Sequence, residues 1–134
     1  SIYGNYPTAG AAVYGATKAA VIFLSESLRM ESQGRIKVTT IRPTGVPLTG
    51  LGNGIVNPEA VSGLLGSNTA AYMSKFEAAE AGQLPKSMLD RNEIEYFALD
   101  PDSLSEQIVY TINQPWGVSI SDITVRASGD SYVL

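Results

Sequence analysis

The sequence predicts an α/β fold with parallel strands, on three observations. Apolar residues recur at helical spacing over residues 11–32, and a β-branched segment at 36–42 follows directly. A second helix and strand are predicted over 101–113 and 119–126. A helix that turns into a buried strand is half of an α/β unit, and such units place their sites at the carboxyl ends of the strands.

The first helix is predicted from apolar residues at steps of three and four. They are Val13, Ala16, Ala20, Phe23, Leu24 and Leu28. Pro7, Thr8 and Gly10 precede the helix as a loop, and Gly34 follows it as a C-cap. The first half of this helix is rich in alanine, whose small side chain allows a neighbouring helix or strand to approach closely.

The strand over residues 36–42 ends abruptly at Pro43, which cannot continue a central strand. Residues 44–68 are rich in Gly, Pro and Asn and predict a long loop, which in a compact domain is usually functional or mobile. Residues 70–81 have a helical pattern of only moderate amphipathicity, and residues 83–99 are ambiguous.

The second helix carries the clearest start signal in the chain. Asp100 is predicted to be its N-cap, Pro101 occupies the first helical position, and Asp102 adds an acidic charge to the first turn. Its apolar stripe consists of Leu104, Ile108, Val109 and Ile112. The following residues 119–125 alternate as a strand does.

Composition excludes several classes of function. The chain has 134 residues, of which 44% are hydrophobic and 16% charged, enough for one modest core. Its net charge of −4 offers no basic field for nucleic acid. It has no cysteine and no histidine, which excludes disulfides, thiol nucleophiles and the usual zinc sites, and no metal is expected. No apolar run approaches the ~18 residues of a membrane span and no secretory signal is visible, so a cytoplasmic protein is expected.

Tyr14 and Lys18 form the strongest chemical pattern. A spacing of four places both side chains on one face of the first helix, about one turn apart. A phenol that shares its surroundings with an ammonium favours the phenolate, which makes Tyr14 a usable proton donor or acceptor. For an isolated pair the ordinary alternative is an interfacial tyrosine and a solvated lysine.

The residues around this pair resemble the short-chain dehydrogenase/reductase family. The string from Val13 to Ala20 contains its Tyr-x-x-x-Lys motif, and Ser1 lies thirteen positions before Tyr14, where the family places a serine. Residues 41–46 fall on its Pro-Gly-x-Val segment and Thr49 on the threonine after it, while residues 100–126 are similar to its terminal helix and strand. The resemblance covers nearly the whole chain and is closest to the branch acting on 3-hydroxy acids, serine-like hydroxy acids and related small alcohols.

The resemblance implies a doubly wound, parallel-sheet Rossmann-type fold. Residues 1–134 would form the carboxyl-terminal part of a single domain, with 44–99 as its substrate loop region. The implied activity is an oxidoreductase that interconverts a small alcohol or hydroxy acid and its carbonyl with NAD or NADP. The resemblance also implies a homo-oligomer, a dimer or tetramer, in which Phe23, Leu24 and Leu28 lie at a subunit interface.

The same resemblance implies roles for individual residues. Tyr14 would be the general acid or base, Lys18 would lower its pKa and bind the ribose, and Ser1 would polarise the substrate oxygen. Tyr14 and Lys18 would both bind the cofactor, whose nicotinamide would be held by Pro43, Thr44, Gly45, Val46 and Thr49. Loop capping is an equally good interpretation of Thr49.

Some residues depart from the family pattern. Thr44 stands where the family usually has glycine, and Pro47 stiffens the same loop. The run Gly50–Gly54 is rich in glycine, but it neither follows a strand nor precedes a convincing helix, so a loop or substrate lid is a better interpretation than a phosphate cradle. Because the sequence starts at Ser1 without a methionine, a preceding mononucleotide-binding half that selects NAD or NADP is expected.

Three alternatives stay open on the sequence. The first is a non-catalytic remnant or assembly module that keeps the fold but lacks the nucleotide-binding half. The second is a sugar-nucleotide epimerase or dehydratase with the same tyrosine and lysine, which would need a larger substrate domain than residues 44–99. The third makes Ser1 a nucleophile with its own amine as the base, although the layered antiparallel sheets expected of that class are not predicted.

Overall fold

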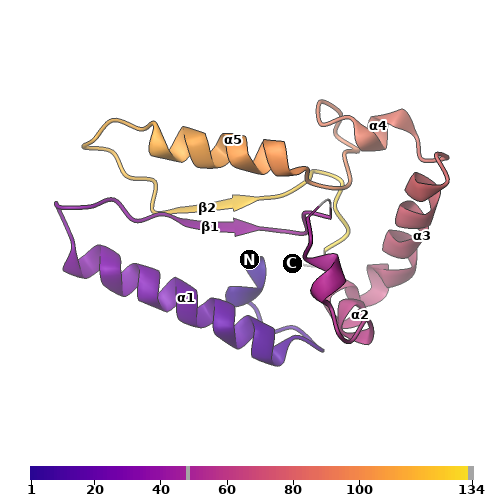
Figure 1. Ribbon diagram of the computed structural model, residues 1–134, viewed down its shortest axis with the longest axis horizontal. Coiled ribbons are helices and arrows are strands. Elements are labelled where there is room, and N and C mark those ends of the chain that lie inside the picture. Colours follow the sequence, from indigo (N-terminus) through magenta and orange to yellow (C-terminus); the bar gives the residue numbers. More distant parts are fainter. Residues whose placement is uncertain (48, 133–134) are drawn as a thin grey trace.

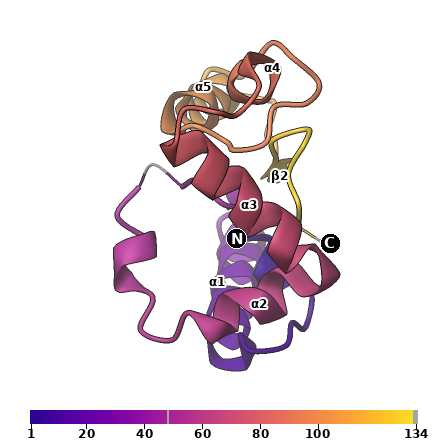
Figure 2. The same ribbon diagram turned by 90° about the vertical axis from the view of Figure 1, so that its right-hand side faces the viewer.

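The computed structural model describes residues 1–47 and 49–132, so Leu48 of the predicted 44–99 region lies outside the described residues. The central unit consists of α1 (Ala12–Glu31), β1 (Thr40–Pro43), α5 (Pro101–Ile112) and β2 (Asp122–Val125). The strands β1 and β2 pair in parallel, with Thr40 opposite Asp122 and Pro43 opposite Val125. The helices α1 and α5 lie on opposite sides of this strand pair (Figures 1 and 2). The predicted α/β class with parallel strands is therefore confirmed.

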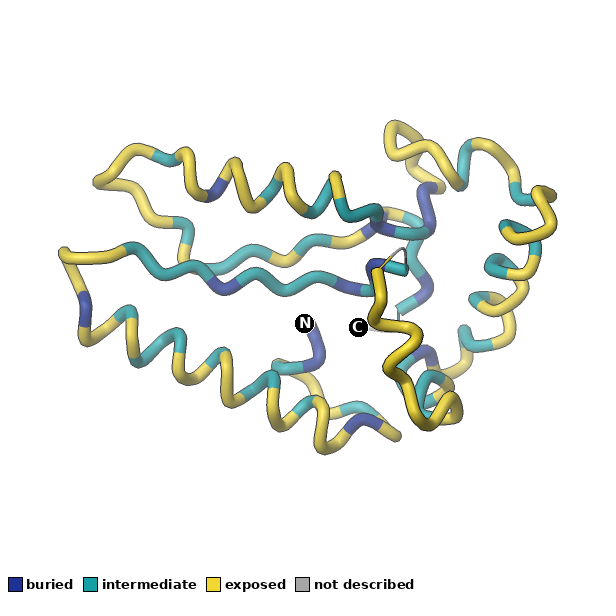
Figure 3. Tube along the Cα trace, viewed as in Figure 1, coloured by how far each residue is buried: buried dark blue, intermediate teal, exposed yellow. Residues whose placement is uncertain are grey.

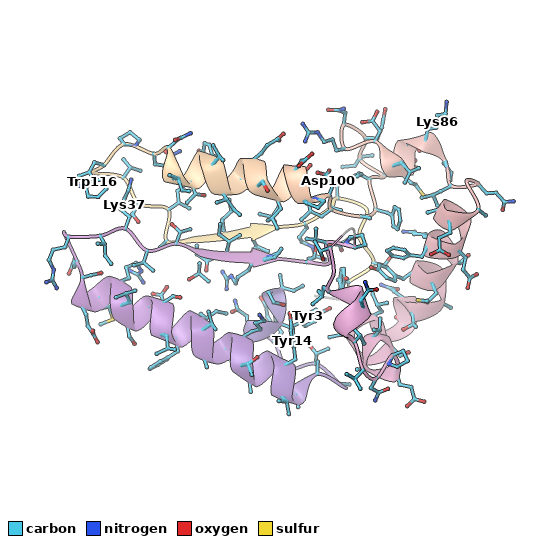
Figure 4. The ribbon with its side chains drawn as sticks, viewed as in Figure 1. Tyr3, Tyr14, Lys37, Lys86, Asp100 and Trp116 are labelled. Atoms are coloured by element: carbon cyan, nitrogen blue, oxygen red, sulfur yellow. The ribbon has the colours of Figure 1, made fainter. Side chains whose placement is uncertain are left out.

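Both strands are shorter than the sequence predicts, because side chains replace the backbone ladder at one end of the pair. The strand predicted over 36–42 begins at Thr40 and the one predicted over 119–126 begins at Asp122. Upstream of β1, the Lys37 ammonium donates at 2.9–3.0 Å to the carbonyls of Gln114, Pro115 and Val118. The Thr39 hydroxyl donates to the Ile120 carbonyl at 2.6 Å. The two segments thus stay side by side, with Lys37 also over the ring of Trp116 (Figure 4).

The region between β1 and α5 is mostly helical. It contains, in chain order, η2 (Gly52–Gly54), α2 (Glu59–Leu65), η3 (Gly66–Asn68), α3 (Thr69–Glu80) and α4 (Lys86–Leu89). The helix predicted over 70–81 is present as α3. The prediction of a loop over 44–68 is wrong for the residues that form α2. This helix is too short to show a helical period, and tertiary contacts stabilise it, since Leu65 at its end is fully buried.

The core lies where the carboxyl ends of the strands meet the start of α5. Its buried residues are Val46, Tyr96, Leu99 and Ala127, with Leu104 and Val125 packed against them. No residue of α1 is buried, and its Phe23 and Leu24 are largely exposed (Figure 3). No helix among the residues that the structure describes is long and apolar enough to cross a membrane.

The start of α5 confirms the predicted N-cap. Asp100 accepts hydrogen bonds from the Ser103 backbone N–H at 2.6 Å and the Ser103 hydroxyl at 2.8 Å. The Tyr96 hydroxyl donates to the same carboxylate at 2.5 Å. These hydrogen bonds lower the pKa of Asp100 from 3.8 to about 2, and the bond from Tyr96 has the largest effect.

We expect Asp100 to make stability fall in acid. Because its folded-state pKa lies below its unfolded value, the stabilising contribution is complete above the unfolded pKa and is lost as pH falls from about 3.8 to about 2. Urea unfolding of the complete protein across this range should show a smaller loss in Asp100→Asn than in the wild type. Asp102→Asn is the matched control, because Asp102 lies exposed in the same turn. Equal acid sensitivity of Asp100→Asn and wild type would contradict this account.

Candidate functional site

The structure places Tyr14 and Lys18 together near the start of α1. The Lys18 Nζ lies 5.4 Å from the centroid of the Tyr14 ring, so the two side chains share one face of the helix as their spacing predicts. The Tyr14 side chain is 38% exposed, and its hydroxyl has no hydrogen-bond partner within the described residues. This hydroxyl is therefore available to a ligand.

The short helix η1 (Ile2–Gly4) packs against α1 and brings Ser1 to the same end of the molecule. A Cβ on Gly4 would lie 2.9 Å from the Lys18 carbonyl carbon, so only glycine permits this approach. Ser1 caps η1, its hydroxyl oxygen accepting from the Tyr3 N–H at 3.2 Å.

A cavity of about 570 Å³ lies beside Tyr14. Its walls come from the start of α1, the loop after β1, the glycine-rich run, α2 and the last described residues of the chain. Representative wall residues are Tyr14, Gly45, Leu51, Val61 and Tyr132. The run Gly50–Gly54 thus contributes to a cavity wall, as the lid interpretation expects, and Tyr3 lies beside Tyr14 in the view with side chains (Figure 4).

The residues predicted to hold a nicotinamide divide into two groups. Thr44 and Gly45 line the cavity, and the Thr44 hydroxyl is buried without a hydrogen-bond partner. Pro43 ends β1 and Val46 lies in the core, both away from the cavity walls. The Thr49 hydroxyl donates to the Val46 carbonyl at 2.8 Å, which is loop capping. A role for these residues toward a nicotinamide stays a prediction.

Two cavity residues, Tyr3 and Tyr132, carry no sequence signal. The Tyr132 ring packs over the loop after β1, where a Cβ on Gly45 would overlap its hydroxyl and lie 2.9 Å from its Cζ. The rings of Tyr3 and Tyr132 meet edge to face at 6.1 Å. No motif marks either tyrosine, because their position depends on contacts between the two ends of the chain.

Tyr3 and Tyr132 stay protonated at neutral pH. Burial is the main cause that raises the pKa of both phenols well above the ordinary value of 10. The hydrogen bond to Tyr72 raises the pKa of Tyr132 further. The charge of Asp130 raises the pKa of both phenols further. Tyr3 and Tyr132 can therefore act as neutral hydrogen-bonding groups and not as bases.

Comparison with known proteins relates the first part of the chain to a known family. The sequence pattern of short chain dehydrogenases matches residues 1–60, the part that contains Ser1, Tyr14 and Lys18. The chain is also 29% identical over 126 residues to an uncharacterized oxidoreductase of Staphylococcus aureus strain N315, an alignment covering 94% of this chain and 39% of that protein.

An uncharacterized oxidoreductase of Staphylococcus epidermidis strain ATCC 35984 is 26% identical over 126 residues, with the same coverage of 94% and 39%. The chain thus spans about two fifths of the length of these two relatives. No solved structure gives a significant match to the chain.

The nicotinamide nucleotide that the family implies can be tested against the residues present. The Lys18 ammonium makes no ion pair or hydrogen bond within the described residues, so it can serve a ribose hydroxyl. The Thr44 hydroxyl lies in the loop expected to meet the carboxamide, but neighbouring atoms cover its oxygen. Of these groups, Lys18 fits the ribose end of the nucleotide. No group of three or more acidic, histidine or cysteine side chains in residues 1–47 and 49–132 could hold a metal ion.

Proposed function

We propose that the complete protein is an NAD- or NADP-dependent oxidoreductase that interconverts a small alcohol and its carbonyl. The observation that carries the proposal is the hydroxyl of Tyr14, which has no hydrogen-bond partner in the described part of the chain and lies at a cavity wall under the Lys18 ammonium. A proton donor must be within reach of a substrate and not engaged elsewhere, and Tyr14 meets both conditions.

In the direction of reduction, Tyr14 donates its phenolic proton to the carbonyl oxygen, and in oxidation its phenolate takes the proton from the alcohol. The nucleotide, when bound, supplies the hydride that the carbonyl carbon receives. Lys18 keeps a positive charge beside the Tyr14 ring and would bind the ribose. Ser1 would donate a hydrogen bond to the same substrate oxygen as negative charge develops there.

We also propose a doubly wound sheet and a homo-oligomer for the complete protein. The parallel pair β1–β2 with α1 and α5 on opposite sides is consistent with one edge of such a sheet. On α1 the side chains of Phe23, Leu24 and Leu28 are exposed together. An apolar face of this kind is typical of a surface that another element or subunit covers.

Isotope transfer tests the proposed reaction. The complete protein is incubated with NADH or NADPH that carries deuterium at the reactive position of the nicotinamide, together with a panel of aldehydes, ketones and oxo acids. The proposal predicts an alcohol with one deuterium on the former carbonyl carbon, detected by mass spectrometry. If no member of the panel acquires deuterium from either nucleotide, the result favours the non-catalytic alternative.

A further inference from the structure

We propose that the cavity beside Tyr14 selects an uncharged substrate with an apolar body and rejects carboxylate anions. This inference rests on the proposed function for the reacting end of the substrate. It narrows the substrate class to simple alcohols and ketones, away from the hydroxy acids that the sequence resemblance favours.

The cavity walls are aliphatic and aromatic. The side chains that face it, apart from the tyrosines and Thr44, include Leu51, Ile55, Val61 and Leu64. Among the described residues no lysine, arginine, aspartate or glutamate lines the cavity. Such a surface stabilises an apolar ligand by burying its area and offers no counter-charge to an anion.

The phenols of the cavity offer one free hydrogen-bond donor. The Tyr3 hydroxyl donates to the Leu64 carbonyl at 3.0 Å, and the Tyr132 hydroxyl lies 3.4 Å from the Tyr72 hydroxyl. The Thr44 hydroxyl oxygen is covered by neighbouring atoms. Of these three tyrosines, only Tyr14 has no hydrogen-bond partner for its hydroxyl in the described part of the chain. One donor matches one carbonyl oxygen, whereas a carboxylate would add two further acceptor oxygens to be satisfied.

The nearest cations are held outside the cavity. Arg126 donates to both carboxylate oxygens of Asp130, at 2.7 and 3.1 Å, and to the Tyr132 backbone carbonyl at 3.2 Å. It therefore lies behind the backbone of Tyr132 and is already paired. Lys18 lies over the Tyr14 ring and does not line the cavity. A substrate carboxylate would be desolvated there without a positive partner, which is unfavourable.

A matched pair of ketones tests this selectivity on the complete protein. Acetoacetate and methyl acetoacetate have the same reacting ketone, and the ester lacks the negative charge and carries one additional methyl group. We expect kcat/KM for the ester to exceed that for the anion by more than about tenfold, and cyclohexanone to be reduced as well. Equal or preferential reduction of acetoacetate would overturn the inference while leaving the proposed oxidoreductase intact.

A positive charge introduced at the edge of the cavity tests whether the absence of a cation causes the selectivity. Leu51 lines the cavity and is 60% exposed, so Leu51→Arg can be accommodated, and it should shift the kcat/KM ratio toward acetoacetate by about tenfold. The matched control is Leu89→Arg on α4, 56% exposed and outside the cavity, which should leave the ratio unchanged. An unchanged ratio in Leu51→Arg contradicts the inference.

Binding without turnover separates the two proposals. Saturation-transfer NMR of both ketones with the Tyr14→Phe protein reports occupation of the cavity directly. Preferential binding of the ester supports the selectivity even if no deuterium transfer is found, in which case the proposed reaction alone fails. Preferential binding of acetoacetate overturns the selectivity whatever the activity is.

Discussion

Replacing Tyr14 by phenylalanine in the complete protein is expected to lower kcat by about 10²–10⁴-fold, the usual contribution of a positioned acid or base. The substitution removes the hydroxyl and leaves the ring, so the contact with Lys18 at 5.4 Å from the ring centroid is kept. Because the hydroxyl has no partner among the described residues, its loss breaks no hydrogen bond of the fold. Stability and nucleotide affinity should therefore stay close to wild type while turnover is lost.

Three measurements check this result: steady-state kinetics, calorimetric titration of the nucleotide, and thermal unfolding. Tyr110→Phe is the matched control, since Tyr110 is an exposed tyrosine on α5 that does not line the cavity. It should leave all three measurements unchanged. Full activity of Tyr14→Phe would exclude Tyr14 as the proton donor and with it the proposed mechanism.

Replacing Gly63 by alanine is expected to destabilise the protein by about 1–3 kcal/mol, the usual cost of overpacking. Gly63 lies within α2, where helix propensity alone predicts that alanine stabilises by about 0.5–1 kcal/mol. In the structure the expected change in stability has the opposite sign, because a Cβ on Gly63 would overlap the Ala9 carbonyl oxygen and lie 2.6 Å from the carbonyl carbon. Both obstructing atoms belong to backbone and cannot rotate away.

The same contact holds a wall of the cavity in place. Gly10, next to the obstructing carbonyl, has φ +77° and packs on Ala60 of α2, so the loop and the helix each contribute one glycine that admits close approach. Forcing α2 away from this loop should also widen the cavity and lower kcat/KM. Gly52→Ala in η2 is the control, because nothing lies within 4 Å of a Cβ built there. If urea unfolding shows Gly63→Ala to be as stable as Gly52→Ala, the close packing of α2 on this loop is wrong.

Elements with strong local signals were predictable. The helix over 11–32 has a long apolar period, and α1 spans Ala12–Glu31. Asp100 and Pro101 mark the start of α5 because capping and fixed φ act within a few residues. By contrast, the seven residues of α2 have no readable period, and the strand limits depend on which residues the partner strand reaches.

The candidate site divides in the same way. Tyr14 and Lys18 meet because a helix places residues four apart on one face, which is a local property of the chain. The family match over residues 1–60 likewise depends on local sequence. Whether Ser1, Pro43, Val46 and Thr49 act as the family pattern predicts remains a prediction for the complete protein.

The sequence by itself determined the α/β class, the principal helices, the pairing of Tyr14 with Lys18 and the match of residues 1–60 to short chain dehydrogenases, because each is encoded by neighbouring residues. Only the tertiary structure decided what surrounds the Tyr14 hydroxyl. Tyr132 reaches the cavity by packing over Gly45, and α2 reaches it through contact between Gly63 and the Ala9 carbonyl. Contacts between residues so far apart depend on the path of the whole chain, so the shape and polarity of the cavity followed from folding and not from any motif.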